Sequence, residues 1–192
     1  MKKKLAIFAS GSGTNAEKFF EYFRDSNEVE ICLLLSNKAD AFALHRAKNH
    51  NVATCVFDKE DMYKSDSVLK LLQKNRIDFI VLAGFLWLIP KNLIAAYPNK
   101  IINIHPALLP KYGGKGMYGM RVHEKVKENG DAESGITIHL VNEKYDEGEF
   151  LIQKSAPIYN SDSPEDIANK IHQLEYQYFA EVVDDYVRNF DY

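Results

Sequence analysis

Short apolar runs alternate with helix-like segments through the first hundred residues, and this alternation is the strongest constraint on the fold. Apolar runs of strand length occur at 5–9, 29–35, 53–57 and 79–83, and segments with helical spacing lie between them at 16–23, 41–51 and 59–75. Helices between consecutive strands are the crossover connections that a parallel sheet requires. We therefore predict an α/β fold whose N-terminal half is doubly wound and Rossmann-like.

The remaining sequence extends this sheet and adds antiparallel strands. It predicts a short helix over 90–97, a strand over 101–104, a helix over 120–129 and strands over 135–141 and 150–154, which are close enough in sequence to pair antiparallel. Ser163 and Pro164 precede two acids and an apolar repeat that predicts a long terminal helix. The expected result is a mostly parallel sheet of about seven strands in a single domain, residues 1–192.

Charge and cysteine content disfavour several classes of protein. Lys and Arg total 24 and Asp and Glu total 27, and the resulting net charge of -3 is spread along the chain. No basic block suggests a nucleic-acid or membrane partner, and apolar runs such as 79–85 are too short to cross a bilayer. Cys32 and Cys55 are expected to be buried free thiols, and no Cys/His spacing predicts a metal site. We expect a cytoplasmic protein with small-molecule partners.

A glycine-rich turn follows the first strand and precedes the first helix. After Ser10, it comprises Gly11, Ser12, Gly13, Thr14 and Asn15. Such a turn directs backbone N–H groups and the positive end of a helix at one point, and glycine lets an anion approach closely. The turn therefore predicts a phosphate site.

The same turn permits two other interpretations. Gly11, Gly13 and Ala16 satisfy the dinucleotide pattern G-x-G-x-x-A, which normally requires an acid after the second strand to bind a ribose hydroxyl. This chain has Ser36-Asn37-Lys38 there, so NAD is disfavoured, whereas Lys38 could meet the additional phosphate of NADP. Alternatively, the turn only lets a helix pack closely on a strand.

Asn103, His105 and Asp146 supply the parts of an acyl-transfer site. Asn103 and His105 are two residues apart, so their side chains share one side of an extended segment, and Pro106 favours extended backbone at His105. When an amine attacks a formyl group, the carbonyl oxygen becomes an oxyanion and the amine nitrogen becomes cationic. Asn103 and His105 can donate to that oxygen. Asp146 is expected to raise the pKa of His105, keep it protonated and relay the amine proton.

Each of these residues also has a structural interpretation. A histidine beside proline is usually a loop residue, and an aspartate near a glycine commonly forms a turn. Taken alone, each member of the trio is more often structural than catalytic. The other histidines receive no catalytic role, although His139 lies on a strand leading toward Asp146; they are His45, His50, His123 and His139.

Several motifs occur in an order that resembles one known family. They are residues 10–15, Ser36-Asn37-Lys38-Ala39-Asp40-Ala41, Leu82-Ala83-Gly84-Phe85, Asn103-Ile104-His105-Pro106 with Leu108-Leu109-Pro110, and Asp146-x-Gly148. Together they resemble the folate-dependent phosphoribosylglycinamide formyltransferases of purine biosynthesis, over about residues 4–180. The resemblance implies the formyltransferase fold and transfer of a formyl group from 10-formyltetrahydrofolate to the amine of glycinamide ribonucleotide, without a metal.

The resemblance also implies a set of site residues. Asn103, His105 and Asp146 match the catalytic trio. The ribonucleotide would be bound by Gly11, Ser12, Gly13, Thr14, Asn15, Pro106, His172 and Glu175, although a solvated helix face is the simpler interpretation of the last two. The folate would contact Leu86, Trp87, Leu88, Ile89, Ile94, Ile101, Asn103, Val141 and Asn142. Such an enzyme would be a monomer or a homodimer.

Three features depart from the family pattern. Trp87 stands where many relatives carry arginine, and Glu149 replaces a proline after the Asp-x-Gly element. The segment 113–119 is longer and richer in glycine than the usual loop, and is expected to be a mobile lid. Lys115 in that loop would either reach the phosphate or face solvent.

Three other functions stay open on the sequence. A sugar-nucleotide N-formyltransferase would share the trio, although the phosphate turn favours the ribonucleotide. An NADP-dependent reductase would use the turn as a dinucleotide site. A non-catalytic folate- or nucleotide-binding module would bind its ligand without turnover.

Overall fold

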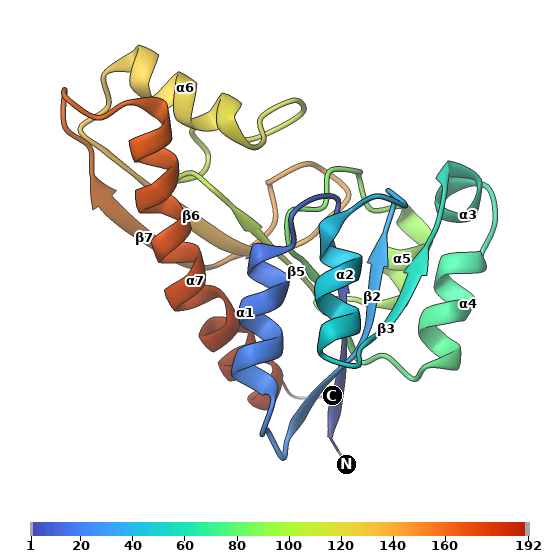
Figure 1. The fold of residues 1–192 in the computed structure, drawn as a ribbon. Helices are drawn as coiled ribbons and strands as arrows, with labels where there is room; N and C mark the ends of the chain where they lie inside the picture. The colour runs from blue at the N-terminus through green and yellow to red at the C-terminus, as the bar shows by residue number, and fades with distance from the viewer. Residues whose placement is uncertain (1, 191–192) are drawn as a thin grey trace.

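A seven-stranded sheet with helices on both faces forms the computed structural model, which describes residues 2–190 (Figure 1). The strands are β1 (Lys3–Phe8), β2 (Val29–Ser36), β3 (Ala53–Val56), β4 (Phe79–Leu82), β5 (Ile101–His105), β6 (Glu133–Leu140) and β7 (Phe150–Pro157). Their order in the sheet is β3-β2-β1-β4-β5-β6-β7. All pairings among β1 to β5 are parallel, whereas β6 is antiparallel to both β5 and β7. The predicted fold class is confirmed.

Seven helices connect and cover these strands in the described part of the chain. They are α1 (Thr14–Phe23), α2 (Phe42–Asn49), α3 (Lys59–Tyr63), α4 (Ser67–Lys74), α5 (Lys91–Ala96), α6 (Met120–Asn129) and α7 (Pro164–Arg188). Helix α7 begins where predicted, because Ser163 and Asp166 form a capping box ahead of it. None of the described helices combines the length and apolar composition needed to cross a bilayer.

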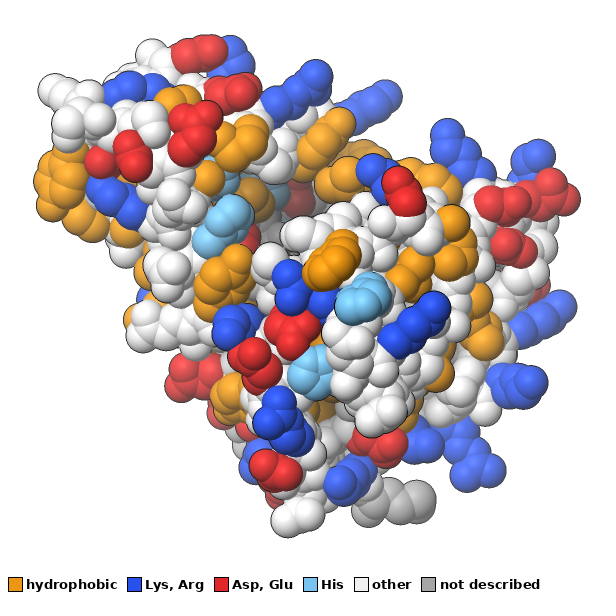
Figure 2. Space-filling model, viewed as in Figure 1, with side chains coloured by type: hydrophobic (Ala, Val, Ile, Leu, Met, Phe, Trp, Pro, Cys, Tyr) orange, Lys and Arg blue, Asp and Glu red, His pale blue; other side chains and the backbone are white. Residues whose placement is uncertain are grey.

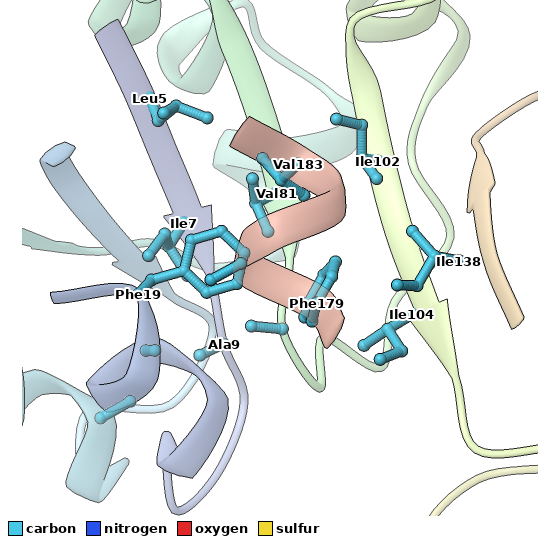
Figure 3. Packing of buried hydrophobic residues seen from close by; sticks show 14 of the residues in the cluster. Leu5, Ile7, Ala9, Phe19, Val81, Ile102, Ile104, Ile138, Phe179 and Val183 are labelled. Atoms are coloured by element: carbon cyan, nitrogen blue, oxygen red, sulfur yellow. The ribbon is translucent and has the colours of Figure 1, made fainter. Parts of the chain in front are cut away.

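The core has two layers because alternate residues of each strand face opposite sides of the sheet. Leu5 and Ile7 of β1 belong to the layer under α1, α2 and α7, whereas Ala6 and Phe8 belong to the layer under α3, α4 and α5. In the first layer, the rings of Phe19 in α1 and Phe179 in α7 meet edge to face, with centroids 4.9 Å apart (Figure 3). Helix α7 is thereby fixed beside α1, next to the glycine-rich turn.

One predicted helix is wrong in its extent. The segment 59–75 forms two helices, α3 and α4, rather than one. Ser65 lies between them, and its hydroxyl lies 2.8 Å from the Ser67 hydroxyl and donates to the Asp61 carbonyl. Short polar side chains that bond to nearby backbone and side-chain groups compete with continuous helix, so the run 65–67 interrupts it.

The two cysteines are free, as predicted, but they are not fully buried. Cys32 and Cys55 are both only partly covered. Cys55 lies on β3, which forms one edge of the sheet, so one side of that strand has no neighbouring strand to cover it.

Candidate active site

The predicted trio meets at the end of β5. Asn103 and His105 lie on β5, and the antiparallel partner β6 places His139 opposite Asn103 and Thr137 opposite His105. Asp146 reaches the same place from the loop between β6 and β7, where its backbone has a φ of 56°. The structure therefore brings all three side chains together, as the sequence predicts.

His105 is held in one orientation by a backbone carbonyl. Its side chain is almost completely buried, and its Nε2 lies 2.7 Å from the carbonyl oxygen of Tyr112. A carbonyl only accepts hydrogen bonds, so Nε2 carries the hydrogen. The other ring nitrogen, Nδ1, faces Asp146, with Oδ2 of the carboxylate 3.6 Å away. The nitrogen available for proton transfer is therefore Nδ1.

The prediction that the pKa of His105 is raised, so that the ring stays protonated, is wrong. Burial lowers the pKa of His105, and this effect exceeds the upward effects of Asp146 and of the Tyr112 carbonyl. Asp146 thus acts in the predicted direction but does not dominate. Because the ordinary pKa of histidine is about 6.5, His105 is mainly neutral at neutral pH.

Asp146 is an ionised carboxylate in this site. Burial alone would raise its pKa, but interactions with the protonated forms of His139 and His105 and the hydrogen bond from the Gly114 N–H together lower it below the ordinary value. The Gly114 N–H donates to Oδ2 at 2.9 Å, and Oδ1 lies 3.7 Å from His139 Nε2. The loop residues Tyr112 and Gly114 therefore fix both members of the His105–Asp146 pair.

His139 belongs to the site, although no catalytic role is predicted for it from the sequence. Its Nδ1–H donates to the Leu140 carbonyl at 2.8 Å, which leaves Nε2 to accept from the Asn103 amide at 3.0 Å. His139 thereby selects the orientation of the Asn103 amide. The contact depends on the register between β5 and β6. The pattern of apolar residues in one strand does not predict its register with a neighbouring strand.

Replacing His139 by Ala is expected to lower kcat by roughly 10- to 100-fold, since losing a hydrogen bond that orients a polar group costs on the order of 1–3 kcal/mol. Steady-state kinetics on the purified variant checks this, with the exposed His45→Ala as the matched control. A kcat equal to that of the control would show that Asn103 is oriented without His139.

Gly148 anchors the loop that carries Asp146. A Cβ at this position would lie 1.7 Å from the Leu140 carbonyl oxygen and 3.4 Å from His139 Nδ1. No side chain fits there, so the loop can pass close enough to β6 for Asp146 to reach both histidines. This contact gives the glycine of the Asp-x-Gly element a physical role.

The glycine-rich turn forms an uncapped helix N-terminus. Gly13, with a φ of 70°, precedes α1 and no side chain caps the helix. Within residues 2–190, the N–H groups of Ser12, Gly13 and Thr14 have no hydrogen-bond partner in the protein. Several unpaired N–H groups at the positive end of a helix can bind an anion, so this geometry supports the phosphate site, which stays a prediction.

Glu175 lies beside this turn and is not on a solvated helix face. It is 7% exposed and accepts a hydrogen bond from Asn15 Nδ2 at 2.9 Å. The amide oxygen of Asn15 is buried and has no hydrogen-bond partner among the described residues. A buried acceptor without a partner is costly, so a ligand donor is the simplest way to satisfy it. His172, one turn earlier, is half-buried and its ring stacks on Tyr176.

The molecular surface is hollowed between the lobe that carries α6 and the body that carries α1 and α2 (Figure 2). The turn before α1 lies on the body, and β5 and β6 lead from the body toward the lobe (Figure 1). A substrate in this hollow would therefore have an anion site and a set of proton-transfer groups within reach.

Comparison with known proteins decides the family. The family model described as formyl transferase matches residues 3–183. The chain belongs to the formyl transferase family. Its sequence is 42% identical to a chloroplastic phosphoribosylglycinamide formyltransferase of Arabidopsis thaliana, over 95% of this chain and 64% of that protein. It is 35% identical to the phosphoribosylglycinamide formyltransferase of Haemophilus influenzae, over 94% of this chain and 85% of that protein.

Solved structures agree with this membership. The phosphoribosylglycinamide formyltransferase of Bacillus halodurans is 33% identical and superimposes with a TM-score of 0.87, covering 97% of this chain and 96% of that one. The formyl transferase described here spans about two thirds of the length of its Arabidopsis relative, or 64%.

The residues predicted to bind folate differ in accessibility within this formyl transferase. Leu86 is 39% exposed and Trp87 is partly exposed, whereas Ile89 and Ile101 are buried in the second core layer. The last two can therefore shape a pocket but offer little surface to a ligand. The other predicted folate contacts are all partly exposed: Leu88, Ile94, Asn103, Val141 and Asn142.

The features that depart from the family pattern lie on the surface of this formyl transferase. Trp87 packs against Phe57, Tyr63 and Phe85, and Lys59 lies over its ring, with Nζ 5.8 Å from the ring centroid. Glu149, Lys115 and Lys38 are exposed, and Pro106 is partly exposed directly after β5. Nothing in the described residues draws Lys115 to the turn.

Proposed function

We propose that this formyl transferase transfers the formyl group of 10-formyltetrahydrofolate to the primary amine of glycinamide ribonucleotide, giving formylglycinamide ribonucleotide in purine biosynthesis. The names of its relatives in Arabidopsis thaliana and Haemophilus influenzae support this substrate. We further propose that it acts in the cytoplasm, as a monomer or a homodimer, and without a metal.

The distance between the glycine-rich turn and the trio of Asn103, His105 and Asp146 is the main support for the proposal. The anion turn follows β1, the proton-transfer groups stand at the end of β5, and only β4 separates these strands in the sheet. Two inter-strand spacings amount to about 10 Å. Nine covalent bonds join the phosphorus of glycinamide ribonucleotide to its amine nitrogen, a reach of roughly 9–11 Å at ordinary bond lengths. The phosphate can thus occupy the turn while the amine lies beside His105.

The groups around the turn suit the ribonucleotide. The N–H groups of Ser12, Gly13 and Thr14 would donate to phosphate oxygens, with the positive end of α1 behind them. The unpaired Asn15 oxygen and the Glu175 carboxyl group would accept from ribose hydroxyls. The folate would lie along exposed Leu86, partly exposed Trp87 and Leu88, and the backbone near 141.

The proposed reaction uses the trio in sequence. Asn103 donates from its amide to the formyl oxygen, and the substrate amine attacks the formyl carbon, forming a C–N bond. Nδ1 of neutral His105 takes the proton that the amine must lose, and Asp146 stabilises the resulting imidazolium at 3.6 Å. The bond between the formyl carbon and the folate nitrogen then breaks, and His105 returns its proton to that nitrogen.

A direct assay tests the proposed activity. The purified protein is incubated with 10-formyltetrahydrofolate and glycinamide ribonucleotide, and release of the deformylated folate is followed by absorbance. Turnover that disappears in His105→Ala is expected. Ligand binding without turnover would instead indicate a non-catalytic module, and a change in nicotinamide absorbance with NADP would indicate a reductase.

The pH dependence of kcat is expected to show an acid limb. His105 must be neutral to accept the proton, and its pKa is lowered by burial, so kcat should rise as pH increases through a value below about 6.5 and then level off. Asp146 stays ionised through this range because its pKa is also lowered. Rates measured from about pH 5 to 8 check this. A kcat that falls as pH rises over this range would show that the imidazolium is the active form.

A further inference from the structure

Helix α2 holds two carbonyl groups of the glycine-rich turn, those of Gly11 and Ser12. The Ala43 N–H, in the first turn of α2, donates to the Gly11 carbonyl at 3.1 Å. Nε of Arg46, one turn later, donates to the Ser12 carbonyl at 2.9 Å. The turn therefore rests on α2 through two successive peptide groups, and one of these contacts comes from a charged side chain.

The orientation of these carbonyls fixes the direction of the neighbouring N–H groups. Both peptide bonds are trans, and in a trans peptide the N–H points opposite to the C=O. With the Gly11 and Ser12 carbonyls turned toward α2, the N–H groups of Ser12 and Gly13 point away from it. These are two of the N–H groups that the proposed phosphate would use, so α2 aims the anion site.

Arg46 is itself held in place on several sides. Its Nη1 lies 3.2 Å from the Glu17 carboxylate, and its guanidinium lies over the Phe42 ring, 5.0 Å from the centroid. Glu17 also bonds His50 Nε2 at 2.6 Å. The side chains of Arg46, Glu17 and His50 are only 27%, 23% and 18% exposed. Basic, acidic and histidine side chains adjoin one another over α1 and α2 in Figure 2.

Arg46 also offsets an unfavourable charge. Glu17 lies in the first turn of α1, close to the helix end where the phosphate would bind. Burial alone would raise the pKa of Glu17, but His50 and Arg46 lower it, so the group is ionised. An unpaired carboxylate there would repel a bound phosphate.

We propose that Arg46 is a positioning residue for the phosphate-binding turn: its guanidinium bridges Glu17 and the Ser12 carbonyl, and thereby aims the N–H groups of Ser12 and Gly13 at the ribonucleotide phosphate. This role rests on the proposed function. It concerns substrate binding only, because Arg46 contacts none of Asn103, His105 or Asp146 among the contacts described.

The test compares Arg46→Ala and Arg46→Lys with the wild type. Arg46→Ala is expected to raise the KM for glycinamide ribonucleotide about tenfold, with kcat and the KM for the formyl folate within about twofold, as for loss of one charge-assisted hydrogen bond. Arg46→Lys should give a smaller rise of about threefold, because an ammonium keeps the charge but cannot bridge both partners like a guanidinium. Equal rises in both KM values would overturn the proposal.

A second variant separates orientation from charge. If Arg46 orients the turn, Glu17→Gln added to Arg46→Ala should leave the KM for the ribonucleotide raised. Return of that KM to the wild-type value would mean that Arg46 only neutralises Glu17, and would overturn the proposal. Arg188→Ala is the matched control, since Arg188 pairs with Asp184 and Glu28 in another part of the molecule.

The proposed function and the role of Arg46 can fail separately. Wild-type turnover in the same assay tests the function. Calorimetric titration with inorganic phosphate tests Arg46 without turnover, and about tenfold weaker binding to Arg46→Ala is expected. Unchanged phosphate affinity in that variant would overturn the role of Arg46 whatever the enzyme assay shows.

Discussion

Replacing Asp146 by Asn is expected to lower kcat by about 1,000-fold while the fold is retained. The carboxylate lies 3.6 Å from His105 Nδ1, 3.7 Å from His139 Nε2 and 2.9 Å from the Gly114 N–H. An amide has nearly the same shape but no charge, so it cannot stabilise the His105 imidazolium formed when the amine loses its proton. Single-turnover kinetics of formyl transfer measures the loss.

The neighbouring Glu147→Gln provides the control for this variant. Glu147 is exposed and pairs with Lys144, so its replacement should leave kcat within about twofold. His105→Ala should show a loss similar to that of Asp146→Asn, and the double variant should add little, because the two residues act as one unit. A kcat within tenfold of wild type in Asp146→Asn would remove this carboxylate from the mechanism.

Replacing Gly13 by Val is expected to weaken glycinamide ribonucleotide binding by at least about 100-fold, with folate affinity within about threefold. Gly13 has a φ of 70°, and a Cβ there would lie 2.6 Å from the Ala43 Cα. The side chain would push the turn off α2 and redirect the N–H groups that we propose bind the phosphate. Isothermal calorimetry with each ligand separately measures the two affinities.

Gly130→Val is the matched control for the backbone conformation. Gly130 has a similar φ of 65°, but a Cβ there would meet nothing within 4 Å. It should therefore show the strain of a positive φ without changing either affinity. If Gly13→Val weakened the binding of both ligands equally, the turn would not be the phosphate site.

The alternating strands and helices of the N-terminal half could be predicted because each element carries its own local pattern. The runs around β1 and β4 are apolar on both faces, as strands covered on two sides must be. The break between α3 and α4 is not predicted, because the apolar residues on its two sides suit one helix, while Ser65 and its polar neighbours end the helix locally. Periodicity alone does not weigh these competing hydrogen bonds.

The candidate site was only partly predictable. Asn103 and His105 could be paired because two residues of one strand share a face, and Asp146 joined them through its family motif. His139 and Tyr112 act through contacts between segments distant in sequence, and these depend on strand register and loop path. The lowered pKa of His105 depends on how deeply the folded chain buries the ring, and a local sequence pattern does not predict that burial.

Tyr112 couples helix α6 to the His105 ring. Its carbonyl holds His105, while its hydroxyl donates to Asp131 at 2.8 Å and accepts from Asn129, where α6 ends. A displacement of that end of α6 would therefore move Tyr112 and, through its carbonyl group, the His105 ring. A molecule that displaced the C-terminal end of α6 would therefore be expected to block the proposed activity without occupying the proposed substrate site, which makes this end of the helix a rational target for an inhibitor that does not resemble folate.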